Sequence, residues 1–348
     1  MSIGGPRVDE ETPLLRSANS ETAVCQDRDV RMAEREKQRR DELKGYVFMA
    51  LSALGFASNS LCVKALAVAG FPSLEIVFAR SVMQLGLGLL GCLYYGISPV
   101  GRGGWSVRRL LVLRGAAGAF GNACFFYAVT KMTLADATVV FFTSPVFSAV
   151  FAYVILGEPY GVFDRVASVV CLLGIVLVLK PSMVFGEGPI LLEVPSTGSQ
   201  SRGAAAALVG AMSGALAYCA VRKVGRTVHS IVHVVYFGVL SLVGSLVAMY
   251  LGVQSTPPVR MPASTREWTL MAILGTFAFL GQVLLNRGLQ LAPAGPGTLM
   301  RNLDVVFAFL FGITLFGEIP DRIGVAGAVV IVGCTAAMGL HKWITSRR

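Results

Sequence analysis

From Gly45 onward, long apolar segments alternate with short polar connections along the chain. Ten of these segments contain about 20 mainly apolar residues each, the length that an α-helix needs to cross the hydrocarbon core of a bilayer. The predicted spans cover residues 45–66, 74–95, 110–130, 134–156, 163–180, 203–222, 230–251, 268–290, 296–316 and 322–340. The connections at 67–73, 131–133 and 291–295 are so short that the helices they join must be antiparallel neighbours.

The composition agrees with this pattern. The 348 residues are 54% hydrophobic and 14% charged, whereas a soluble domain has about 25% charged residues. The spans leave no room for a sizeable soluble domain, so we expect an all-α polytopic membrane protein. The net charge of +10 is then a property of the loops and not a nucleic-acid footprint. Six of the seven cysteines lie in apolar segments without CxxC spacing, which favours buried small hydrophobes over metal ligands or disulfides.

Residues 1–44 are predicted to form a disordered, charged cytosolic tail. Between Asp27 and Lys44 the charges alternate almost residue by residue, with seven basic and six acidic side chains, which suits a solvated helix. No apolar segment typical of a signal peptide precedes the first span. The segment Glu10–Leu15 fits the acidic-dileucine pattern of many endosomal and lysosomal membrane proteins, although such short matches are common by chance.

The placement of lysine and arginine predicts the orientation, because cytosolic loops carry an excess of these residues. With a cytosolic N-terminus, the inside loops contain Arg102, Arg108, Arg109, Arg222, Lys223 and Arg226. The C-terminal tail, residues 342–348, adds three more, and the opposite side holds fewer. We therefore expect both termini in the cytosol. An endolysosomal or vacuolar membrane, the endoplasmic reticulum and the plasma membrane all stay open as locations.

The second half of the chain repeats the first at an offset of 160 residues, without a gap over 38 positions. The aligned pairs are Gly121 with Gly281, Asn122 with Gln282, and Gly157-Glu158 with Gly317-Glu318. Each half then contains five spans, in residues 45–180 and 202–341, and the segment 181–201 connects them. Because five is odd, the second half enters the membrane from the opposite side. Inverted repeats of this kind are typical of transporters that alternate access around a midplane site.

Short motifs occur in both halves: Phe78–Arg80, Arg114-Gly115, Leu134–Thr138, Ser144–Phe147, Ala294–Pro296 and Asp304–Phe309. Together they resemble the EamA-type unit of the drug/metabolite transporter superfamily and, more closely, solute carrier family 35, subgroup G. The resemblance covers about residues 45–343. It implies a ten-helix fold of two inverted five-helix EamA repeats and a carrier role. Substrates of relatives include nucleotide sugars, amino acids, organic anions and drugs. For subgroup G, it implies transport of citrate-like organic anions or a regulatory role in calcium homeostasis.

Five charged side chains within the spans are candidate substrate ligands: Lys64, Arg80, Arg287, Arg301 and Asp304. A charge near the bilayer centre costs about 2.5–3.5 kcal/mol, so such residues normally face a bundle interior or a watery cavity. Four cations with few acids create a positive cavity, which suits an anion because arginine binds carboxylate or phosphate through two hydrogen bonds. In this interpretation Asp304 holds Arg301 or titrates in proton coupling.

Structural alternatives exist for each candidate. Lys64 and Arg287 could extend to the membrane interface instead. Arg80 could pair with Glu75 for packing alone, and Arg301 with Asp304 likewise. Three further candidates are amides, Asn59, Asn122 and Gln282, which either line the cavity or only join helices through hydrogen bonds.

Two pairs of titratable residues have ambiguous roles. His229 and His233 are spaced like a metal pair on a helix, but no third ligand accompanies them, so no metal site is predicted. Glu158 and Glu318 end equivalent spans, where they form either gating contacts or ordinary interfacial charges.

The sequence lacks GxSxG, HExxH, P-loop and CxxC patterns, so neither an enzyme nor a bound cofactor is predicted. The leading interpretation is a secondary transporter or exchanger of a small organic anion or another polar metabolite, working by alternating access. The alternatives are a non-transporting membrane regulator, for example of calcium homeostasis, and a nucleotide-sugar carrier. The predicted partners are the anionic substrate and the lipid bilayer. Glycine-rich faces would permit a homodimer, and no nucleic-acid partner is expected.

Overall fold

The computed structural model describes residues 13–129, 131–180, 182–185, 197–252, 260–316 and 322–345. In these ranges the regular secondary structure is entirely helical, and ten helical segments are long and apolar enough to cross a membrane. The predicted all-α polytopic fold is confirmed. Some predicted features lie outside the described residues: Glu10–Thr12 of the dileucine pattern, the connector residues 186–196, Glu318, and the last three residues of the chain.

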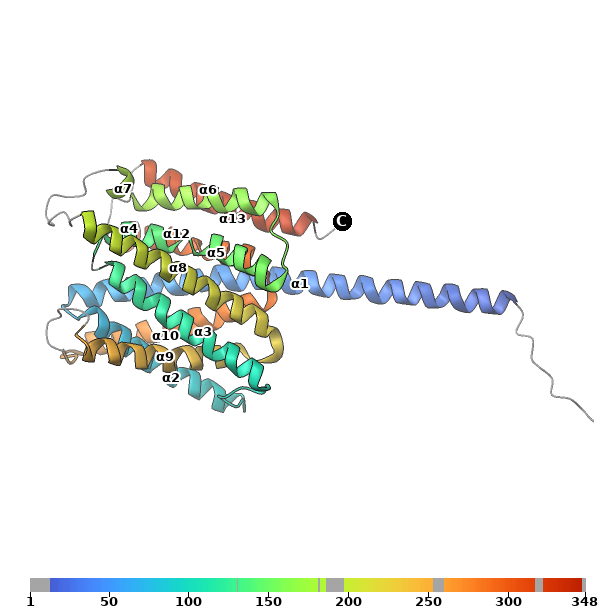
Figure 1. Cartoon of the computed structure of the whole chain (residues 1–348), viewed down its shortest axis with the longest axis horizontal. Helices are drawn as coiled ribbons and strands as arrows, with labels where there is room; N and C mark the ends of the chain where they lie inside the picture. Colours follow the sequence, from blue (N-terminus) through green and yellow to red (C-terminus); the bar gives the residue numbers. More distant parts are fainter. Residues whose placement is uncertain are drawn as a thin grey trace, which may run out of the picture.

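The helices follow the predicted spans closely (Figure 1). The first repeat contains α1 (Pro13–Val68), α2 (Ser73–Tyr94), α3 (Trp105–Val129), α4 (Leu134–Phe141), α5 (Ser144–Phe151), the π-helical turn η1 (Ala152–Leu156) and α6 (Val162–Leu179). After the short α7 (Ser182–Phe185), the second repeat contains α8 (Thr197–Val224), the 3-10 turn η2 (Gly225–Thr227), α9 (Ser230–Tyr250), α10 (Thr265–Leu291), α11 (Ala294–Met300), α12 (Leu303–Phe316) and α13 (Arg322–Thr345).

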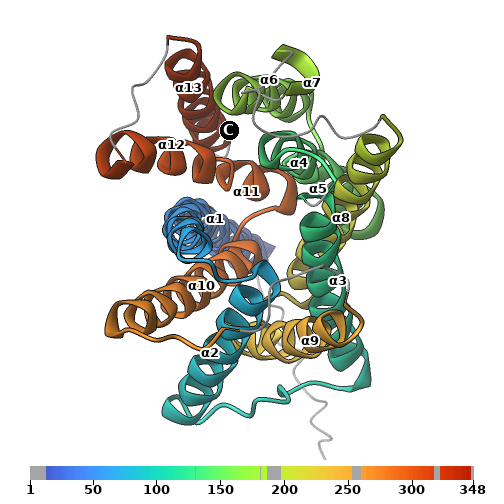
Figure 2. The ribbon, with the colours of Figure 1, turned by 90° about the vertical axis from the view of Figure 1, so that its left-hand side faces the viewer.

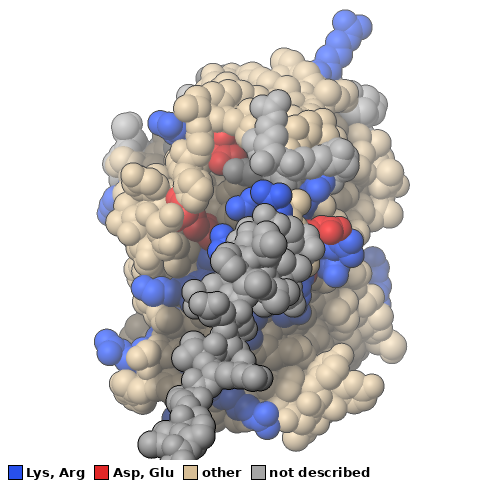
Figure 3. Space-filling model, turned by 90° about the vertical axis from the view of Figure 1, so that its right-hand side faces the viewer, with Lys and Arg blue, Asp and Glu red and all other residues tan. Residues whose placement is uncertain are grey.

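The helix α1 extends far out of the bundle on one side (Figure 1). We call this end of the bundle the N-terminal side and the other end the far side. Residues 13–44 belong to this helix, and their alternating charges suit a solvated helix. Contacts between successive turns, such as the Glu36–Arg40 ion pair at 2.5 Å, support the projecting helix, and Asp41 pairs with Arg226 at 2.6 Å. Lysine and arginine side chains gather around the base of α1 (Figure 3).

The two repeats pack against each other around a pseudo-two-fold axis. Helix α1 packs on α10 as α8 packs on α3, while α2 packs on α9 and α6 on α13 (Figure 2). The hydroxyl oxygens of Ser81 and Ser241 are 2.9 Å apart and share a hydrogen bond. These serines are separated by 160 residues, so equivalent residues of the two repeats meet at the axis. The packing therefore extends the sequence register to α2 and α9.

Glycine permits two equivalent helix crossings. Where α3 crosses α8, a Cβ atom on Gly210 would lie 3.0 Å from the carbonyl oxygen of Gly121. Where α1 crosses α10, a Cβ atom on Gly55 would lie 3.1 Å from the Cα atom of Gly281. Both distances are shorter than ordinary contacts, so each crossing requires glycine, which has no Cβ atom. Since Gly121 and Gly281 are equivalent in the repeat, both halves use the same device.

The apolar core is shared between the repeats. The largest buried cluster includes Met49 of α1, Cys171 of α6 and Leu285 of α10. A second cluster, on the N-terminal side, joins Leu111 of α3 to Val232 of α9. Because each cluster contains residues of both repeats, neither repeat completes its core alone.

Candidate functional site

Two of the spans are broken helices, and the breaks occupy equivalent positions. The fourth span is interrupted at Phe142-Thr143, between α4 and α5, and the ninth at Arg301-Asn302, between α11 and α12. The offset of 160 residues places Phe142 opposite Asn302. Irregular backbone at membrane depth is tolerated only where it is buried in protein or lines a cavity, and transporters commonly build substrate sites from such helices.

Local sequence explains the first break. Pro145 lies in the first turn of α5, where its missing N–H group is harmless, whereas a continuous helix would need that donor. At the second break the chain changes to tighter hydrogen bonds. The N–H of Arg301 donates to the carbonyl of Thr298 at 3.2 Å, and that of Asp304 donates to the carbonyl of Arg301 at 3.0 Å.

The two breaks meet around one small pocket, which we call the break site. It is lined by Phe141, Phe142, Ser144 and Pro145 of the first repeat and by Tyr218, Thr298, Arg301 and Asn302 of the second. The pocket therefore lies between the repeats, where a midplane site of an inverted-repeat protein is expected.

Arg301 is the cation of the break site. Its guanidinium donates a hydrogen bond to the hydroxyl of Tyr218 and lies 4.7 Å from the ring centre of Phe56 and 5.7 Å from that of Tyr218. Its Nε atom is buried and has no hydrogen-bond partner among the described residues. The predicted ion pair with Asp304 is not formed, because the turn at the break replaces the regular helix on which the three-residue spacing would bring both side chains together. Arg301 thus keeps unused donors beside the pocket.

Arg80 approaches the same region from α2. It lies on the helix face of Gln84, which is fully buried, and within electrostatic reach of Arg301. The predicted pair with Glu75 is wrong, because that carboxylate accepts the backbone N–H of Arg260 at 3.0 Å instead. In the described part of the chain, Arg80 makes no hydrogen bond or ion pair. Arg80 and Arg301 therefore repel one another, and no carboxylate among the described residues bridges them.

The other predicted residues are not brought to the break site. Lys64 and Arg287 are exposed, near the far side and the N-terminal side respectively, and Arg287 reaches Gln290 at 3.4 Å. Asn59 donates to the carbonyl of Leu274 at 3.0 Å and so joins α1 to α10. Asn122 lines a separate pocket between α2, α3 and α9. For these four residues the structure favours interface, packing or a different pocket.

A buried arginine that the sequence interpretation did not select holds Gln282. Arg114 of α3 donates to the side-chain oxygens of Gln282 at 2.7 Å and Asn286 at 3.2 Å, and its guanidinium lies 4.9 Å from the ring centre of Phe237. We call Arg114, Gln282 and Asn286 the Arg114 clamp. The four-residue spacing of the two amides on one helix face was the available signal. Tyr218, which lies within electrostatic reach of Arg114, links the clamp to Arg301.

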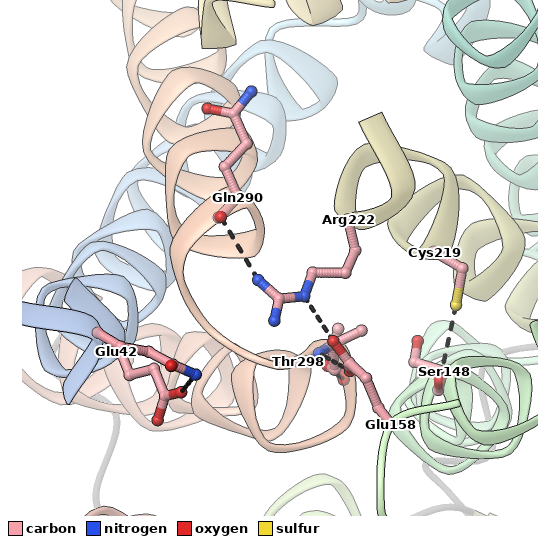
Figure 4. A network of polar contacts seen from close by, with 9 residues as sticks. Glu42, Ser148, Glu158, Cys219, Arg222, Gln290 and Thr298 are labelled. Atoms are coloured by element: carbon pink, nitrogen blue, oxygen red, sulfur yellow. Dashed lines mark hydrogen bonds and ion pairs between the residues drawn. The ribbon is translucent and has the colours of Figure 1, made fainter. Parts of the chain in front are cut away.

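A second polar network ties the helices together at the N-terminal side (Figure 4). Glu158 pairs with Arg222 at 2.5 Å, and its other oxygen accepts the backbone N–H of Ala294 at 2.9 Å. Arg222 also donates to the carbonyl of Gln290 at 3.4 Å. Gly157, with φ of +67°, turns the chain so that Glu158 faces inward. The network joins the end of the fourth span to α8, α10 and α11.

The two histidines have separate environments. The Nδ1 atom of His229 accepts the N–H of Ile231 at 3.4 Å and caps α9, and burial together with the charge of Arg287 lowers the pKa of His229. His233 is fully buried, and within the described ranges neither of its ring nitrogens has a hydrogen-bond partner. The described residues include no group of three or more His, Cys, Asp or Glu side chains placed to hold a metal ion.

Ten spans in two pseudo-symmetric repeats, with broken helices meeting between them, define a membrane transporter. The model of the EamA-like transporter family matches residues 43–180 and 201–339, and the chain belongs to this family. The resemblance to the EamA unit and to subgroup G is therefore confirmed.

Known relatives cover most of the chain. Human solute carrier family 35 member G1 is 33% identical over 309 residues, which are 87% of this chain and 81% of the relative. The pseudopaline exporter CntI of Pseudomonas aeruginosa strain UCBPP-PA14 is 31% identical over 305 residues, 87% of this chain and 98% of the relative. A solved crystal structure with 19% identity shares the fold, with a TM-score of 0.68 over 87% of this chain and 99% of that one.

Proposed function

We propose that this transporter is a secondary carrier of a small organic anion and that the anion binds at the break site between Arg80 and Arg301. The observation that carries the proposal is the meeting of two equivalent helix breaks beside two cations that lack a carboxylate partner. On the insertion scale each cation near the bilayer centre costs about 2.5–3.5 kcal/mol, and an anionic ligand offsets that cost.

The geometry of Arg301 supports a bidentate contact with a carboxylate or phosphate. The rings of Phe56 and Tyr218 flank the guanidinium, and such cation–π contacts fix its plane while leaving donors along its edge. The relatives include a protein named as a pseudopaline exporter, which supports a carrier of a polar metabolite.

Alternating access supplies the mechanism. The Glu158–Arg222 network and the Arg114 clamp hold helices of both repeats together on the N-terminal side. In the proposed cycle these contacts release when the break site turns toward that side. The lysines and arginines around the base of α1 support a cytosolic N-terminal side, and an even number of spans then puts the C-terminus in the cytosol as well. The domain boundaries, a homodimer and the identity of the membrane stay predictions.

Transport assays in proteoliposomes test the site. Purified wild-type protein, Arg80→Gln and Arg301→Gln would be compared for uptake of a panel of labelled mono-, di- and tricarboxylates and organic phosphates at constant pH. Loss of a charged hydrogen bond predicts a fall in kcat/KM of about 10- to 100-fold for each variant. The exposed Arg287→Gln is the matched control and should transport like the wild type. Undiminished anion uptake by folded Arg301→Gln protein would contradict the proposal.

A further inference from the structure

We infer that Asp304 is a proton-binding residue of this carrier and that its protonation draws the anion into the break site, so that proton and anion move together. The inference rests on the proposed function. It starts from the position of Asp304 in the first turn of α12, directly after the break that contains Arg301.

Asp304 is a carboxylate inside the bundle without a compensating partner. The residue is 9% exposed, and in the described part of the chain its side chain makes no hydrogen bond or ion pair. The charge of Arg301 offsets only part of the desolvation cost of an ionised carboxylate here, and binding of one proton from the aqueous phase removes that cost. The reaction is carboxylate plus proton giving the neutral acid, and no other group changes.

Few titratable groups act on this carboxylate. Among the described residues, Arg301 is the charged residue whose field reaches it, from the turn of the break itself. On the helices packed against α12, the thiols of Cys171 on α6 and Cys334 on α13 are already engaged, the first with Asn302 at 3.2 Å and the second with the carbonyl of Ala167 at 3.0 Å. From α1, Phe56 contributes an aromatic ring and no charge. The protonation state of Asp304 therefore acts mainly on Arg301.

The charge balance gives the direction of coupling. With Asp304 ionised, one negative charge partly balances the charge of Arg301, which in turn acts on Arg80. With Asp304 protonated, the same region gains one unit of positive charge, so it binds an anion more tightly. Linkage is reciprocal, so a bound anion also favours the protonated acid. This arrangement describes symport of proton and anion.

The repeat explains why one residue can take this role without disturbing the scaffold. The residue equivalent to Asp304 is Ser144, which lines the break site next to Pro145. The first repeat thus forms the same break without a carboxylate. Asp304→Ser gives the second repeat the serine that the first repeat has at the equivalent Ser144. We expect this variant to fold, because the first repeat forms its break with that serine.

The test compares wild type, Asp304→Asn and Asp304→Ser in proteoliposomes. For the wild type, we expect KM for the transported anion to be about tenfold lower at about pH 5.5 than at about pH 7.5, and a proton gradient to drive accumulation. Both variants should keep anion exchange, with a KM that no longer depends on pH and without gradient-driven accumulation. Asp136→Asn, which alters another buried carboxylate that accepts the hydroxyl of Thr133 at 2.6 Å, should keep the wild-type pH dependence.

A second measurement does not depend on transport. Infrared difference spectroscopy of the purified protein during a pH jump should show the carbonyl stretch of a protonated carboxylic acid in the wild type and in Asp136→Asn, and lose it in Asp304→Asn. A KM with the same pH dependence in Asp304→Asn and wild type, or a carbonyl band that survives in this variant, would overturn the inference. If the band behaves as expected and no anion is transported by wild type, the proposed function fails while proton binding by Asp304 stands.

Discussion

Two equivalent regions of the bundle, one on each side of the membrane, are built differently. On the far side, α2, α3 and α9 enclose a largely apolar pocket of about 360 Å³, which we call the far wedge. Its lining includes Phe126, Leu240 and the amide of Asn122, which makes no hydrogen bond within the described residues. The far wedge is therefore open space, and the Ser81–Ser241 hydrogen bond joins two of its walls, α2 and α9.

The pseudo-two-fold axis relates the far wedge to a region on the N-terminal side between α2, α9 and α10. There the equivalents of Asn122 and Phe126 are Gln282 and Asn286, which are buried and accept hydrogen bonds from Arg114. The residue equivalent to Arg114 is Leu274, which has no hydrogen-bonding side chain. The Arg114 side chain thus occupies the region on the N-terminal side, and no arginine or lysine is among the residues that line the far wedge.

This difference shows how a symmetric backbone acquires two unequal sides. The glycine crossings and the helix breaks are shared by both repeats, so the framework itself has no preferred direction. The Arg114 clamp is present in one copy only. The clamp that distinguishes the two sides therefore consists of a few polar side chains added to a repeated scaffold.

Removal of the clamp should have the largest effect on this comparison. Arg114→Leu gives the first repeat the side chain found at the equivalent Leu274 and leaves two buried amides without their donor. We expect the free energy of unfolding to fall by about 3 kcal/mol, because hydrogen bonds to a charged group contribute about 1.5–3 kcal/mol each. Thermal unfolding in detergent measures the loss. The exposed Arg287→Leu is the control, and equal stability of the two variants would show that the clamp contributes nothing.

A smaller effect should test the symmetric part of the comparison. Gly55→Ala and Gly210→Ala each place a Cβ atom within about 3 Å of the opposite backbone at equivalent crossings. We expect each to reduce the free energy of unfolding by about 1–3 kcal/mol, and by similar amounts. Gly244→Ala, whose Cβ atom would have no neighbour within 4 Å, should leave stability unchanged. Clearly unequal losses at the two crossings would mean that the scaffold is not symmetric in energy.

The smallest effect should distinguish two equivalent amides. Asn122→Leu in the far wedge should change the free energy of unfolding by less than about 0.5 kcal/mol, because no hydrogen bond is lost. Gln282→Leu should cost about 1.5–3 kcal/mol, because it leaves a buried guanidinium short of an acceptor. Chemical unfolding of both variants in the same detergent provides the measurement. A large loss in Asn122→Leu would reveal a polar role for the far wedge.

The spans and the repeat could be predicted because both leave local signals in the sequence. Apolar length identifies a span, and the two glycine anchors fix a register that the contact between Ser81 and Ser241 confirms in space. The sequence likewise predicts a functional position at Arg301 in the ninth span, because a cation in an apolar run is costly.

Hydropathy alone predicts neither the breaks nor the clamp, for two physical reasons. Apolar residues lie on both sides of Phe142 and of Asn302, so each span is long enough to be read as one helix, although Pro145 marks the first break locally. Arg114 lies 168 residues from Gln282 in the chain, and such a partner is known only once the helices are packed. The expected Arg301–Asp304 pair failed for the first of these reasons, because the spacing rule assumes an unbroken helix.

The serine pair on the axis has a consequence for motion. Suppose that the two access states differ because each repeat adopts the conformation of the other. The pseudo-two-fold rotation that relates the states then maps the Ser81–Ser241 contact onto itself. A contact that maps onto itself keeps the same geometry in both states, whereas contacts away from the axis exchange with their counterparts. Under this condition the two hydroxyls lie at a pivot between the repeats, and their contact is kept in both access states.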